Sequence, residues 1–73
     1  MSGIFKFGQV CEVTPTLNIE IQRFQPKSDM KADVTFAVWS PGRRRNYNRV
    51  ATRVAGNIWK FKFEGYEIDF EMI

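Results

Sequence analysis

Apolar and polar side chains alternate along most of this chain, which is the pattern of β-strands that bury one face. Gly8 interrupts the first stretch and predicts a bend or bulge there. Ser40-Pro41-Gly42 predicts a turn after the third stretch. The alternating stretches are residues 4–13, 17–22, 33–39 and 58–70, and a polar, proline-containing loop is expected at residues 25–31.

The last stretch predicts a hairpin whose two-residue turn is Glu64-Gly65. Gly65 supplies the positive φ that such a tight turn needs. With this turn, aromatic and aliphatic residues meet on one face of the hairpin and lysines meet carboxylates on the other. A shift of one residue would mix both faces, so the pattern fixes the register. The expected pairs are Phe63–Tyr66, Lys62–Glu67, Phe61–Ile68, Lys60–Asp69 and Trp59–Phe70.

Residues 43–54 show helical spacing instead. Four apolar residues recur at i, i+3, i+4 and i+7, and three arginines recur on the opposite face. Asn46 is suited to cap the start of a helix and Gly56 its end. The alternative is that residues 52–54 begin the next strand. The expected helix turns Tyr47, Val50, Ala51 and Val54 to the sheet and Arg45, Arg49 and Arg53 to solvent.

These elements predict a β-rich α+β fold in the order β-β-β-α-β-β, as an antiparallel sheet or a small open barrel. Residues 1–73 form one domain, because a chain of this length builds a single core. Of its residues, 44% are apolar and 15% aromatic, which suits a core of large rings. Trp39, beside a turn, is expected to be partly exposed. The expected inward residues include Leu17, Ile19, Ile21, Val34, Phe36, Val38, Trp59, Phe61 and Phe63.

Composition argues against several chemistries. The chain has no histidine and one cysteine, so it lacks the commonest general base and the preferred zinc ligands. Glu67 and Asp69 have lysines opposite them, which argues against a carboxylate metal site. We therefore expect a non-enzymatic protein with no catalytic residue, no cofactor and no metal. Without a long apolar run or an intrachain disulfide, we also expect a soluble cytoplasmic protein with no membrane partner, and Cys11 as a small buried side chain.

The arginine-rich segment is the candidate binding surface. Five of the eleven basic residues lie in residues 43–53, with no acid among them. Guanidinium groups bind phosphates and carboxylates in bidentate fashion, and an interleaved ring suits base stacking. The alternative is a solvated helix face whose arginines keep the protein soluble or pair with carboxylates. The expected partner- or nucleic-acid-binding residues are Arg43, Arg44, Arg45, Tyr47, Arg49 and Arg53.

The opening Met-Ser-Gly-Ile-Phe-Lys-Phe-Gly, the length and the basic, histidine-free composition resemble the small transcription regulators of lytic phages that infect Xanthomonas. The resemblance implies docking on host RNA polymerase in the host cytoplasm, inhibition of initiation and antitermination. It assigns no role to any single residue. The alternatives are a small nucleic-acid-binding barrel that uses the arginine face and a minor subunit of a larger assembly.

Overall fold

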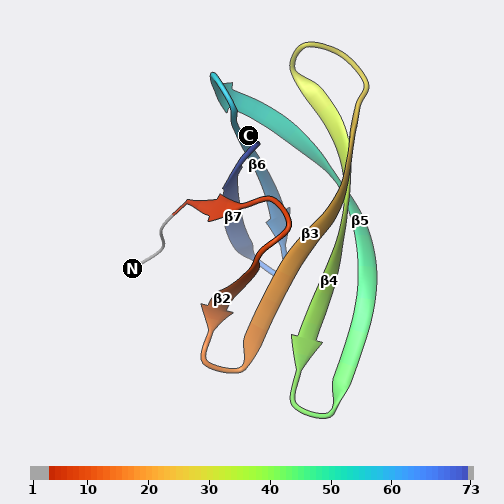
Figure 1. Cartoon of the computed structure of the whole chain (residues 1–73), viewed down its shortest axis with the longest axis vertical. Coiled ribbons are helices and arrows are strands. Elements are labelled where there is room, and N and C mark those ends of the chain that lie inside the picture. Colours follow the sequence, from red (N-terminus) through yellow and green to blue (C-terminus); the bar gives the residue numbers. More distant parts are fainter. Residues whose placement is uncertain (1–3, 73) are drawn as a thin grey trace.

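The computed structural model describes residues 4–72 as one seven-stranded sheet rolled into a nearly closed barrel (Figure 1). Neighbouring strands follow the order β1-β7-β6-β5-β4-β3-β2, and all pairs are antiparallel except β1 with β7. This part of the chain has no helix, and so none that could cross a membrane. The strands are β1 (Phe5–Lys6), β2 (Val10–Thr14), β3 (Leu17–Pro26), β4 (Lys31–Ser40), β5 (Arg43–Ala55), β6 (Ile58–Phe63) and β7 (Tyr66–Glu71).

A short segment after β1 joins the two sides of the sheet. The N–H of Phe7 donates to the carbonyl oxygen of Glu71 at the end of β7, at 3.3 Å. The next N–H, of Gly8, donates to the carbonyl oxygen of Ile21 in β3, at 3.0 Å. Gly8 has a φ of +81°, a conformation that favours glycine. The predicted bend at Gly8 is therefore confirmed, and it divides the expected first strand into β1 and β2.

Three register shifts bend the sheet into a barrel. They lie between β2 and β3, between β3 and β4, and between β5 and β6. A bulge places an extra residue on one strand, which increases the local twist and bend. The shifts occur at residues 12–14, 21–23 and 53–55.

Aromatic rings fill the interior. The ring of Phe36 on β4 lies 4.8 Å from that of Phe61 and 5.2 Å from that of Phe63, centroid to centroid. Phe61 in turn lies 5.8 Å from Phe70 on β7, so the rings connect opposite walls of the barrel. The buried core confirms most of the expected inward residues and comprises Ile19, Ile21, Ala32, Val34, Phe36, Val38, Ala51, Trp59, Phe61, Phe63, Ile68 and Phe70. Of the other expected inward residues, Leu17 is half-buried against this core.

The predicted hairpin is confirmed in all five cross-strand pairs. Glu64 and Gly65 have φ of +53° and +82°, as a turn with two left-handed residues requires. The lysines and carboxylates that face each other do not close into ion pairs. The one ion pair among residues 4–72 joins Lys27 Nζ to Asp33 Oδ1 at 3.5 Å.

The predicted helix at residues 43–54 is wrong, because this segment is the long strand β5. Ten consecutive residues of β4 pair with Arg43–Thr52 of β5. This pairing satisfies the backbone of β4, and the spacing of apolar residues within residues 43–54 does not reveal it. Val50 and Val54 are 51% and 55% exposed rather than turned to the sheet, whereas Ala51 is buried. Gly56 has a φ of +50° in the β5–β6 turn rather than capping a helix. The fold is therefore all-β.

Two smaller expectations need correction. The polar loop is shorter than predicted, because β3 continues to Pro26 and β4 begins at Lys31. Cys11 is half-buried rather than buried, with its Sγ 3.5 Å from the carbonyl oxygen of Gln9.

The ring packing predicts that Phe61→Ala lowers the free energy of unfolding by about 3–5 kcal/mol, because it leaves a cavity between the rings of Phe36 and Phe70. A domain of this size has about 3–5 kcal/mol in total, so the variant is expected to be largely unfolded. Urea titration followed by tryptophan fluorescence measures the effect. The exposed neighbour provides the control, since Lys62→Ala should change the value by less than about 1 kcal/mol. Equal midpoints for both variants would contradict this account of the core.

The hairpin turn predicts a stabilising substitution. Glu64 has a positive φ that asparagine adopts at lower energy, and asparagine before glycine is the favoured pair in this turn. Glu64→Asn should raise the free energy of unfolding by roughly 0.5 kcal/mol or more. A thermal melt followed by circular dichroism provides the measurement. A lower melting temperature would show that the carboxylate of Glu64 matters more than its backbone conformation.

Candidate binding surface on strand β5

All six predicted binding residues lie on β5, but the strand divides them between two faces. Tyr47 pairs with the buried Phe36 of β4, so its side chain lies on the inner face of the sheet. Arg44 pairs with Trp39 and lies on the outer face. Because side chains alternate along a strand, the inner face also receives Arg43, Arg45 and Arg49.

Arg53 is separate from this group. Its Nε donates a 2.8 Å hydrogen bond to the carbonyl oxygen of Gly56, so the guanidinium holds the β5–β6 turn. Ten residues of extended strand separate it from Arg43, a distance of roughly 30 Å. The structure therefore places five of the six predicted residues in the first half of β5, on both of its faces, and assigns Arg53 to a turn.

A hollow of about 500 Å³ opens at the end of the barrel where the β2–β3, β4–β5 and β6–β7 turns gather. Arg43 and Tyr47 line it from β5, and Phe63, Glu64 and Tyr66 line it from the opposite hairpin. The hollow thus combines rings with one basic and one acidic side chain.

Arg49 is held in place by aromatic rings. Its guanidinium carbon lies 5.3 Å from the centroid of Phe63 and 5.8 Å from that of Tyr47. Such cation–π contacts fix the position of the cation, and Nη1 of Arg49 also donates a 2.7 Å hydrogen bond to the carbonyl oxygen of Asn48. Tyr47 packs against Phe63 at 4.8 Å and is half-buried, so its ring belongs more to the core than to a stacking platform.

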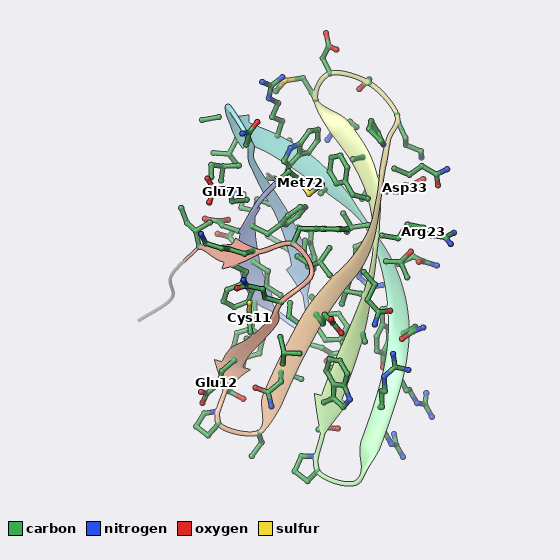
Figure 2. All side chains as sticks on the ribbon, in the orientation of Figure 1. Cys11, Glu12, Arg23, Asp33, Glu71 and Met72 are labelled. Carbon is green, nitrogen blue, oxygen red and sulfur yellow. The ribbon has the colours of Figure 1, made fainter. Side chains whose placement is uncertain are left out.

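The outer face carries a second ring and cation. The guanidinium carbon of Arg44 lies 5.3 Å from the centroid of Trp39. Trp39 is half-buried, whereas Trp59, Phe61 and Phe63 are buried, which confirms the expectation that Trp39 is the most exposed of the four. This outer face also carries the exposed Val50, which pairs with Asp33, and Figure 2 shows Arg23 and Asp33 pointing away from the barrel.

None of the β5 arginines is neutralised by a carboxylate. The only ion pair within residues 4–72 is Lys27–Asp33, on β3–β4. The interpretation that the arginines pair with the chain's own acids is therefore excluded for the described residues. Their positive charge is available to a partner.

Most of β5 has a strand neighbour on one side only. Residues 43–51 pair with β4, but pairing with β6 is confined to Thr52, Arg53 and Ala55. In Figure 1 the lower part of β5 accordingly extends with β4 well away from β6. Sequence reasoning missed this open side, because a helix satisfies its own backbone and has no edge.

Comparison with known proteins gave no assignment: no family model matches the chain, and searches of curated proteins and of solved structures found no match.

The division of the arginines predicts different effects on stability. Arg53→Ala removes the bond to Gly56 and should lower the free energy of unfolding by about 0.5–1.5 kcal/mol. Arg45→Ala, on an exposed part of the same strand, should change it by less than about 0.5 kcal/mol. Urea titration of the two variants measures both changes in the free energy of unfolding. Equal values would mean that Arg53 does not support the turn.

Proposed function

We propose that this chain is a non-enzymatic transcription regulator that docks on bacterial RNA polymerase through β5. The observation that supports it most is a row of unpaired arginines on a strand that projects beyond its neighbour β6. Guanidinium groups bind carboxylates bidentately and stay charged at any cellular pH. A dense positive field also speeds the encounter with an acidic surface. The docking arginines are Arg43, Arg44, Arg45 and Arg49.

Regulation by docking requires no reaction at this protein. A small rigid barrel bound to the polymerase would displace an initiation factor by occupying its space, which inhibits initiation. Bound near the RNA exit path, the same cationic strand would attract nascent RNA and disfavour a terminator hairpin, which promotes antitermination. The choice of polymerase as partner follows the resemblance to the phage regulators.

The second candidate is a small nucleic-acid-binding barrel, and one observation favours it. Arg44 and Trp39 present a cation and a half-buried ring together on the outer face, a combination that suits an unpaired base and its phosphate. On duplex DNA we expect only sequence-independent binding, with Kd of about 10⁻⁴ to 10⁻⁶ M. Binding to polymerase that survives nuclease treatment separates the first candidate from the second.

The proposal predicts that replacing Arg43, Arg44 and Arg45 with alanine abolishes binding to purified RNA polymerase and leaves the melting temperature almost unchanged. These side chains are exposed, so they contribute little to the fold. Wild-type binding should also weaken steeply with salt, since the contact is ionic. Fluorescence anisotropy of labelled protein, with a terminator readthrough assay, provides the readouts.

A charge-matched control removes three exposed cations elsewhere, Lys6, Arg23 and Lys27. Both triple variants lower the formal net charge from +3 by the same amount. The control should keep most of its polymerase binding. If both triple variants lose the same affinity for the polymerase, net charge rather than β5 drives the association. If neither variant loses affinity, the arginines are only a solvated face.

A further inference from the structure

We infer that the open side of β5, residues 43–51, binds an acidic, extended segment of the partner as an additional strand of the sheet. The inference rests on the proposed function for the identity of the partner. Its chemistry, an acidic peptide in β conformation, follows from the backbone and charge of β5.

On this side, residues 43–51 of β5 have no strand partner for their backbone groups, and the carbonyl oxygen of Asn48 accepts a 2.7 Å bond from Nη1 of Arg49. The N–H of Arg53 donates to the carbonyl oxygen of Met30, on the β4 side, at 2.9 Å. Backbone direction alternates from residue to residue, so the odd-numbered residues of β5 bond to β4 and the even-numbered ones point to the open side. An added strand would therefore pair with Arg44, Asn46, Asn48 and Val50, with Arg49 releasing the carbonyl oxygen of Asn48.

The charge around this side selects an acidic segment. Where β5 and β6 separate, a hollow of about 400 Å³ is lined by Arg49 from β5 and by Lys60 and Lys62 from β6, with Phe61 beside them. A strand added to β5 would thus have cations on the strand it joins and on the strand across the gap. Strand addition takes affinity from main-chain bonds and specificity from such side-chain neighbours.

A second copy of this chain is a poor occupant. Two β5 strands placed side by side would bring arginines opposite arginines, which is unfavourable. The acidic strand β7 pairs with β6 throughout and with β1 at Phe70 and Glu71, so at most residues 66–69 have a free side. That is less than half the length of the open side of β5.

The first test separates backbone pairing from charge. Asn46→Pro removes an N–H of the open side without removing a charge or a bond to β4, whereas Asn46→Ala keeps the N–H. We expect Asn46→Pro to weaken binding to purified RNA polymerase at least about tenfold and Asn46→Ala by less than about twofold. Circular dichroism should show both variants folded, since proline is tolerated at an unpaired strand position.

The second test needs neither the polymerase nor a proline variant. A synthetic heptapeptide of alternating glutamate and valine is titrated into wild-type protein and followed by amide hydrogen exchange. Exchange at Arg44, Asn46, Asn48 and Val50 should slow, and a peptide N-methylated at alternate positions should have no effect. Binding without slower exchange at these amides, or no binding, would overturn the inference.

The two tests distinguish this inference from the proposed function. If wild-type protein ignores RNA polymerase but the peptide protects the four amides, the proposed function fails and the inference stands. If folded Asn46→Pro binds polymerase as wild type does, the inference fails and the proposed function stands. Concentration-dependent self-association that Asn46→Pro abolishes would assign the open side to a second copy and overturn the inference.

Discussion

The fold depends on enclosing aromatic rings without a helix to cover them. Phe36 lies at the centre, in contact with rings on β5 and β6, and every one of these rings projects from the same face of one sheet. A single sheet shields one of its faces only by rolling up on itself. The bulges that bend the strands and the Gly8 bond to β3 are therefore requirements of the ring core. A flat sheet with these side chains would expose its whole apolar face.

The strands of the barrel differ in length, and the candidate site lies where the longer strands extend past the shorter ones. β4 has ten residues and β5 thirteen, whereas β6 and β7 have six each. The β4–β5 hairpin therefore extends past the wall that β6 provides. The arginines occupy this excess length, where inner-face side chains reach the rim of the barrel instead of the core. Arg49 over Phe63 marks the point at which the core ends and the candidate binding surface begins.

The sequence pattern predicted correctly those features that depend on residues close together in the chain. The Glu64-Gly65 hairpin was predictable in every pair, because the turn and both faces imply the same register. The helix prediction at residues 43–54 failed because the decisive contact, pairing with β4, is not local, and because β-branched Val50, Thr52 and Val54 suit a strand. The sequence therefore singled out six candidate residues, all of which lie on β5, but not their arrangement. Their division between two faces and the open side follow from strand pairing.

The arginines on β5 serve two physical requirements at once. A long unpaired strand is prone to join other chains, and like charges along it prevent pairing with its own copies. The same charges favour a chain of opposite sign. Alternate side chains on one face of a strand recur every ~7 Å, so an extended partner with alternating acids matches the arginine spacing in the conformation that also satisfies the backbone. In the proposed complex, charge and hydrogen bonding select the same kind of partner, so protection against aggregation and the proposed recognition follow from one arrangement.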